Sequence, residues 1–141
     1  MLQSYCELTI STHGPGLYEF TRQAARAIAE AGIHAGIAAV FCRHTSASLV
    51  IQENADPDVQ RDLLAFFKRL VPDGDPLFVH TLEGPDDMPA HVKAALTQTS
   101  LTIPIVGGEL ALGTWQGLYL FEHRHAPHQR HVIVQALGAQ E

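Results

Sequence analysis

The sequence predicts an α+β fold, a largely antiparallel β-sandwich with two or three helices. Two observations carry this prediction. Short apolar or alternating runs of strand length outnumber the segments with helical spacing. The elements also follow one another as a strand, a helix, two strands, two helices and several strands, which is not the regular alternation that builds a parallel α/β sheet.

The first half of the chain is expected to contain three strands and one helix. Residues 2–10 alternate loosely and form a first strand, which ends in the turn sequence at 13–16. Across residues 17–31 the apolar side chains recur at three- and four-residue spacing, which predicts a helix with one buried face. The short apolar runs 36–42 and 48–52 have the length of strands.

The second half begins with the best-defined helix. Asp56 supplies an N-cap side chain, Pro57 suits the first helical turn, and the apolar stripe ends before Pro72. Two loops and a short helix from Pro89 to about Leu96 follow. The remaining segments expected to be extended are 99–105, 109–114, 115–122 and 130–137, with a hairpin turn at Gly107-Gly108.

Length, charge and composition exclude several classes of protein. The chain has 141 residues with no internal repeat or linker, so we expect a single domain spanning 1–141. A net charge of −6 with scattered basic residues indicates no nucleic-acid partner, and the apolar runs are too short for a membrane span. Because the first residues do not read as a signal peptide, we expect a cytoplasmic protein.

A polar patch, Arg43-His44-Thr45-Ser46-Ala47-Ser48, separates two strongly apolar runs. A buried strand would continue with Val, Ile or Leu here, since buried polar groups cost free energy unless each finds a partner. The patch is either a loop whose hydroxyls cap backbone groups or the lining of a pocket. Cys42, two residues before His44, fits a buried inert thiol better than a metal ligand.

Nine histidines are the unusual feature of the composition. His80 and His91 bracket an acidic loop, and together with His44 they would resemble the three-histidine set of a catalytic zinc with an open position. No sequence spacing typical of zinc sites supports this, and three unrelated surface histidines are the alternative. The histidines at 125, 128 and 131 lie at or near a hairpin tip, where we expect them to be solvated.

Two further groups of residues stand out near the C-terminus. Glu122 and Arg124 end an expected strand, where a carboxylate and a guanidinium can orient ligands or hold an anion. In Gly113-Thr114-Trp115-Gln116-Gly117, glycines flank a bulky side chain, which indicates either a core tryptophan in a bulged strand or close approach by a ligand or another chain. The chain has neither a P-loop nor a nucleophile elbow.

Four motifs together resemble the YjbQ-like family, in its order and with its spacing; they are 44–48, 53–57, 83–91 and 113–117. The resemblance runs from the first strand to Gly138. It implies a small α+β fold with a jelly-roll-like β-sandwich, a homotrimer, and the name secondary thiamine-phosphate synthase. That reaction joins a pyrimidine diphosphate to a thiazole phosphate with release of pyrophosphate.

The resemblance also implies the site. It makes His44, His80 and His91 the ligands of a divalent metal, zinc in the first place and magnesium as the alternative. Asp87 or Glu122 would accept a proton and Arg124 would hold an anion. Pocket and cofactor contacts are expected from Thr45, Ser46, Trp115 and Gln116.

Three functions remain open at this stage. The first is a metal-dependent enzyme acting on a small phosphorylated metabolite, either as a thiamine-phosphate synthase or as a hydrolase. The second is a homotrimer that binds a metal or a metabolite without turnover. The third is a purely structural trimer.

Overall fold

The computed structural model describes residues 1–140, so the single domain expected for 1–141 extends one residue beyond them. Eight strands and three helices alternate along these residues. They are β1 (Leu2–Thr12), β2 (Gly16–Glu19), α1 (Thr21–Ala31), β3 (Ala35–Cys42), β4 (Ala47–Glu53), α2 (Pro57–Leu70), α3 (Asp87–Leu96), β5 (Ser100–Val106), β6 (Glu109–Leu110), β7 (Gln116–Glu122) and β8 (His128–Ala139).

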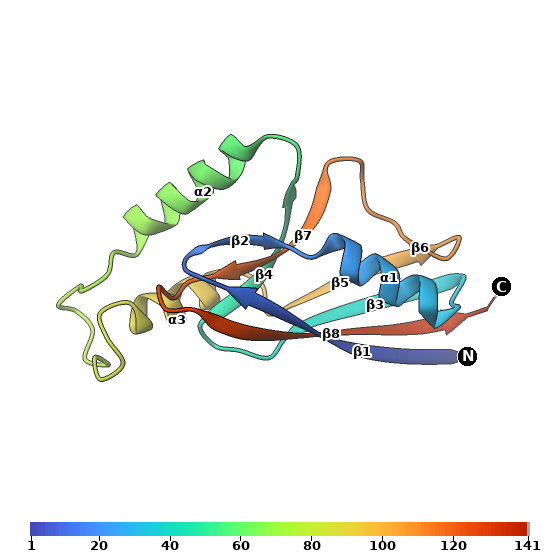
Figure 1. Ribbon diagram of the computed structural model, residues 1–141, viewed down its shortest axis with the longest axis horizontal. Helices are drawn as coiled ribbons and strands as arrows, with labels where there is room; N and C mark the ends of the chain where they lie inside the picture. The colour runs from blue at the N-terminus through green and yellow to red at the C-terminus, as the bar shows by residue number, and fades with distance from the viewer. Residues whose placement is uncertain (141) are drawn as a thin grey trace.

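The strands form two antiparallel sheets that pack face to face (Figure 1). The larger sheet has the order β1-β8-β3-β5-β6 and the smaller one the order β2-β7-β4. Every pairing between neighbouring strands is antiparallel. The prediction of an α+β fold with a mainly antiparallel β-sandwich and two or three helices is therefore confirmed.

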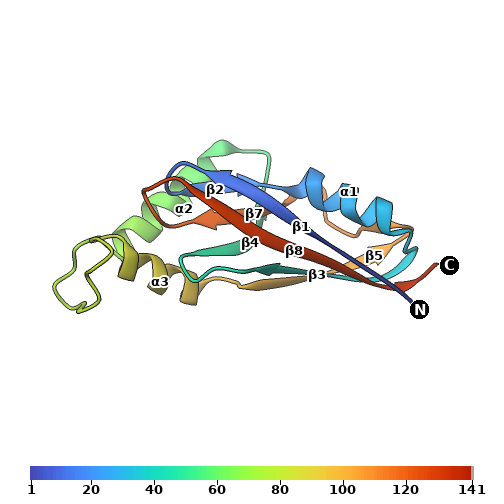
Figure 2. The same cartoon turned by 60° about the horizontal axis from the view of Figure 1, so that its bottom comes forward.

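The core lies between the inner face of the large sheet and a layer made of the small sheet and α1. In β3 the side chains of Ala38, Val40 and Cys42 point inward and are buried, as alternation in a strand requires. Phe20 and Ile28 cover them from the α1 side. Figure 2 shows α1 and β2 on the same side of the long strands β1, β3 and β8.

The largest difference from the expectation lies at residues 17–19, which the sequence pattern assigned to a helix. Leu17 and Tyr18 instead pair with Phe121 and Leu120 of β7, and the helix begins only at Thr21. Sheet pairing with a distant strand thus overrides the local spacing. The expected strand 109–114 is also shorter, because β6 ends at Leu110 and residues 113–116 form a turn.

Two features of the fold position the candidate site. The helix α2 begins as predicted, with the Asp56 side chain accepting a hydrogen bond from the backbone N–H of Asp58, and it carries no buried residue. The loop 71–86 projects beyond one end of both sheets and leads directly into α3 (Figures 1 and 2). None of the helices formed by residues 1–140 is long and apolar enough to span a membrane.

Candidate metal centre

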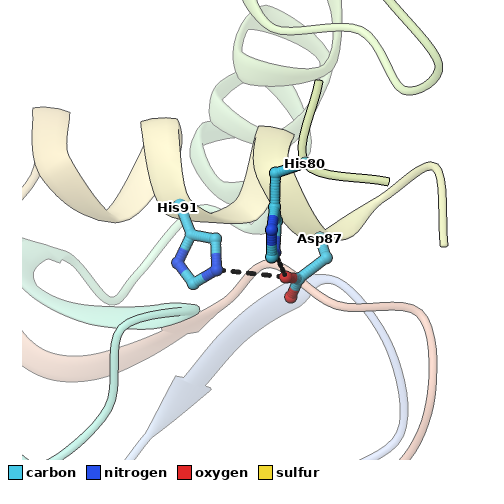
Figure 3. A group of neighbouring side chains, drawn as sticks. All are labelled: His80, Asp87 and His91. Atoms are coloured by element: carbon cyan, nitrogen blue, oxygen red, sulfur yellow. Dashed lines mark hydrogen bonds and ion pairs between the residues drawn. The ribbon is translucent and has the colours of Figure 1, made fainter. Parts of the chain in front are cut away.

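The side chains of His80, Asp87 and His91 converge at the start of α3 (Figure 3). One atom from each group lies within 4.8 Å of the other two. Both imidazoles meet the same carboxylate oxygen: Asp87 Oδ2 is 2.8 Å from Nε2 of His80 and 3.1 Å from Nε2 of His91. The cluster thus presents two ring nitrogens and one oxygen to a common point.

Helix geometry and a short ordered loop bring these residues together. Asp87 and His91 are four residues apart in α3, so their side chains share one face of the helix. His80 comes from the preceding loop, which Asp75 orders by accepting hydrogen bonds from the backbone N–H groups of Leu77 and Phe78. The glycine that follows, at position 84, has a φ of 105°, a conformation suited to glycine.

The hydrogen bonding of His91 fixes which of its nitrogens faces Asp87. Its Nδ1 lies 2.8 Å from the carbonyl oxygen of Thr45, which can only accept, so Nδ1 carries a proton. In the neutral ring Nε2 then holds a lone pair that points at Asp87 Oδ2. A lone pair and a carboxylate oxygen 3.1 Å apart repel unless a proton or a metal cation lies between them. This is the arrangement of a histidine oriented for metal binding.

Asp87 is 2% exposed, and an arginine holds its second oxygen. Nη1 of Arg124 donates to Asp87 Oδ1 at 2.6 Å, while Nε bonds Asp86 and Nη2 bonds the carbonyl of Glu83. Burial would raise the pKa of Asp87, but the hydrogen bond from His80 and the charge of Arg124 oppose it, and the pKa lies below its usual value. The carboxylate is therefore ionised, as a metal ligand must be.

The donor set fits zinc better than magnesium. Zinc binds imidazole nitrogens and carboxylate oxygens, and a catalytic site typically takes three protein ligands with a fourth position open. Magnesium prefers oxygen ligands and retains several waters. Two histidines and one aspartate therefore match zinc or a similar transition metal.

His44, expected as the third histidine, does not join His80 and His91 within this chain. Its Nε2 accepts a hydrogen bond from the backbone N–H of His131 at 2.8 Å, and its ring stacks on that of His131. Burial first, and then the charge of Arg130, lower the pKa of His44. Its lone pair is thus committed to β8, and Asp87 takes the third place in the cluster.

Glu122 has a different role from the expected proton acceptor. It is fully buried, and its two oxygens accept hydrogen bonds from Thr12, from Arg130 and from the backbone N–H groups of His123 and Arg124. Burial raises its pKa, but the bonds from Arg130 and Thr12 outweigh this and lower it. A carboxylate with this many donors and a lowered pKa is a poor base, so Glu122 serves the fold.

Arg124 was expected to hold an anion, but all three of its guanidinium nitrogens donate hydrogen bonds to protein acceptors. Its position makes it the residue that orients Asp87 and ties α3 to the end of β7.

The remaining expected contacts lie in two separate places. Thr45 reaches the cluster through its backbone, and the hydroxyl of Ser46 accepts a hydrogen bond from Arg130. Trp115 is 62% exposed, so it is not a core tryptophan, and Gln116 caps the local turn by accepting from the N–H of Gly113. These two residues stand at the opposite end of β7 from Arg124, about 26 Å away along the extended chain.

Sequence reasoning missed two acidic neighbours of the cluster. Asp86 is buried and binds both Arg124 and the backbone N–H of His125, which fixes the start of α3. Glu83 lies 4.0 Å from Nε2 of His80 with an exposed carboxylate. The acidic residues at 83–87 were the available signal, but their spacing alone did not show which of them joins the histidines and which binds Arg124.

Comparison with known proteins agrees on one family. The sequence model of the UPF0047 protein YjbQ-like family matches residues 6–139. The UPF0047 protein sll1880 of Synechocystis is 54% identical over 93% of this chain and 89% of its own length, and the UPF0047 protein YjbQ of Escherichia coli O157:H7 is 39% identical over 93% and 95%.

Solved structures agree as well. An uncharacterised YjbQ/UPF0047 protein from Clostridium acetobutylicum superimposes with a TM-score of 0.86 at 38% identity, covering 94% of this chain and 99% of that one. The hypothetical protein APE1520 from Aeropyrum pernix reaches a TM-score of 0.88 at 29% identity, over 96% and 98%. The fold, the motifs and these matches lead to one conclusion: the chain belongs to the UPF0047, YjbQ-like family.

Proposed function

We propose that this protein binds a divalent transition metal, zinc by preference, through His80, Asp87 and His91. One observation carries the proposal: two imidazole nitrogens and a buried, ionised carboxylate meet at one point, with His91 oriented by the carbonyl of Thr45. Arg124 and Asp86 supply the supporting contacts that metal sites require.

We further propose that the metal site serves an enzyme acting on a small phosphorylated metabolite. A cavity of about 350 Å³ lies beside His80, lined by the loop 74–85 and by Met88 and Pro89, and it is large enough for such a substrate. A bound metal would supply Lewis-acid polarisation of a phosphate oxygen or an activated water. Thiamine-phosphate synthesis and phosphate ester hydrolysis are the two reactions to assay.

A metal-binding protein without turnover is the second candidate, and one observation favours it. Asp87 belongs to the cluster and Glu122 is saturated with donors, so neither is free to accept a proton from a substrate. Glu83 is the carboxylate left beside His80 for that task. An active enzyme should therefore lose turnover, but keep its metal, when Glu83 is changed to Gln.

Self-association as a cytoplasmic homotrimer is a further part of the proposal. The outer face of the large sheet supports it, because apolar side chains of neighbouring strands lie exposed side by side there. Ile37 of β3 pairs with Leu137 of β8 and with Pro104 of β5, and Phe41 is 47% exposed on the same face. Apolar patches of this kind mark protein–protein contacts.

Metal analysis of protein purified without an affinity tag tests the proposal. We expect about one equivalent of metal in the native protein and in His44→Ala, which is the matched control, and loss of metal in Asp87→Asn and His91→Ala. Loss of metal in His44→Ala together with full metal in Asp87→Asn would replace Asp87 by His44 in the ligand set. Absence of metal from the native protein, after dialysis against zinc and gel filtration, would refute the proposal.

Activity is measured separately on the same proteins. Thiamine-phosphate formation, or release of phosphate from small phosphate esters, that disappears together with the metal supports the enzyme. Full metal occupancy without turnover in either assay supports the binding protein.

A further inference from the structure

A second cavity lies on the other side of α3 from the metal cluster. It has a volume of about 230 Å³ and is enclosed by α2, α3, the end of β7 and the adjoining loops. Apolar side chains from α2 and β7, among them Leu64, Phe67 and Phe121, line one part of it. The rings of Phe67 and Phe121 meet edge to face with centroids 5.2 Å apart. These walls suit a flat, apolar group.

Lys93 of α3 lines the same cavity and is 8% exposed. Among residues 1–140 its ammonium group has no hydrogen-bond or ion-pair partner within bonding distance. Lysine is almost never this deeply buried without a partner, because removing an ammonium from water costs several kcal/mol that a counter-charge must offset. Asp73 and Asp86 are near enough to act on this positive charge, but neither bonds it, so the ammonium keeps its hydrogen bonds available for a ligand in the cavity.

The acidic groups around the cavity are already engaged. Glu122 is bound to Arg130. Asp73 lies 2.8 Å from Nε2 of His125, another residue of the wall. Lys68 of α2 adds a second cation to the lining. A ligand with its own negative charge would therefore complete the site.

His123 supplies a second polar group in the cavity wall. The hydroxyl of Thr97 donates to the carbonyl of Lys93, whose usual helical donor, the N–H of Thr97, bonds Ala94 instead. The hydroxyl oxygens of Thr97 and Ser48 lie 2.6 Å apart, and Ser48 Oγ lies 2.9 Å from Nε2 of His123. The other ring nitrogen, Nδ1, has no hydrogen-bond partner among residues 1–140, and His123 lines the cavity.

We propose that this cavity binds a small organic anion whose apolar ring lies against Phe67 and Phe121 and whose carboxylate pairs with Lys93. The volume admits a single ring, since a cavity of about 150 Å³ already accommodates benzene. A hydroxyl on the ring, which can donate or accept, would find its hydrogen-bond partner in Nδ1 of His123. The inference stands apart from the metal proposal, since none of the three clustered residues lines this cavity.

Binding of 4-hydroxybenzoate to the purified protein tests the inference. Titration is followed by calorimetry and by the ¹⁵N shifts of the His123 ring. We expect saturable binding that moves the His123 signals and that weakens at least about tenfold in Lys93→Met, which keeps the length of the side chain without its charge. The uncharged analogue 4-hydroxybenzyl alcohol should bind weakly and equally to both proteins. Phenyl phosphate shows whether a phosphate can replace the carboxylate.

Two further variants make the outcome decisive. Asp87→Asn should leave the binding of 4-hydroxybenzoate unchanged, so failure of the metal site and failure of this cavity are separately visible. Leu64→Trp, on α2, should fill the cavity and abolish binding even if Lys93→Met does not fold. The inference is wrong if neither anion moves the His123 signals, or if both anions bind native protein and Lys93→Met with equal affinity.

Discussion

Arg124 donates a hydrogen bond to one oxygen of Asp87, and His80 and His91 contact the other oxygen. Its Nη1 donates to Oδ1 at 2.6 Å, while Oδ2 lies 2.8 Å from Nε2 of His80. Oδ1 thus anchors Asp87 to the segment that follows β7, and Oδ2 faces the histidines of the cluster. The orientation of Asp87 depends on a residue 37 positions away in the chain.

The first prediction follows from this contact. Arg124→Met should weaken metal binding by about 10- to 100-fold, because the ligand carboxylate loses the group that orients it. Competition with a chelator during a Co²⁺ titration measures the affinity. Arg61→Met, on an α2 side chain that is 79% exposed, is the control and should bind metal as the native protein does.

The second prediction concerns Glu122. Glu122→Gln should lower the free energy of unfolding by about 3–5 kcal/mol, since it leaves the buried guanidinium of Arg130 without its counter-charge. Denaturant titration measures this. The exposed pair of Glu7 and Arg43 is the control, and Glu7→Gln should cost about 1 kcal/mol or less. Native stability in Glu122→Gln would return Glu122 to the list of candidate bases.

The third prediction is a dependence of stability on pH. Burial, followed by the charge of Lys93, lowers the pKa of His123 to about 3 from its ordinary 6.5. As the pH falls below 6.5, the unfolded chain takes up this proton while the folded protein does not, so stability is lost progressively down to about pH 3. His123→Gln cannot take up the proton.

Denaturant titrations between pH 6.5 and 5 measure the difference. Native protein should lose more stability than His123→Gln, by about 0.7 kcal/mol per pH unit at pH 6.5 and approaching about 1.4 kcal/mol per pH unit near pH 5, because the other titrating groups are common to both. Parallel profiles for the two proteins would mean that His123 titrates normally in the folded state.

The fourth prediction tests the outer face of the large sheet. Ile37→Lys adds a charge at the middle of the exposed apolar face and should reduce the mass in solution to that of one 15.4 kDa chain. Light scattering after gel filtration measures it. Val79→Lys, in the loop before α3 at a side chain that is 95% exposed, should leave the mass unchanged. A monomeric native protein would contradict the proposed trimer directly.

Much of the fold could be predicted because its signals are local. Asp56 and Pro57 mark the start of α2, a short apolar run marks β3, and alternation marks β8. Residues 17–19 could not be predicted, since their structure depends on pairing with β7, a hundred residues later. Helix formation in so short a segment stabilises the chain less than pairing with a neighbouring strand does.

In the candidate site, too, some residues could be predicted from local patterns and others depend on contacts between distant parts of the chain. His80 and His91 could be chosen because they flank an acidic loop, and helical spacing places Asp87 beside His91. The orientation of His44 depends on a backbone N–H of β8, which no local pattern reveals. Lys93 reads as an ordinary polar position near a helix end, and only the packing of α2 against β7 makes it buried.

The ten-residue helix α3 contributes side chains to two separate sites on different faces of the helix, and this restricts insertions and deletions within it. Asp87 and His91 face the metal cluster, while Lys93 faces the cavity beneath α2. Inserting one residue between positions 87 and 93 would rotate the second part of the helix by about 100° against the first and dismantle both arrangements. The loop that precedes α3 has its Leu77, Val79 and Leu82 side chains in solvent, so these three positions can change where Asp87, His91 and Lys93 cannot.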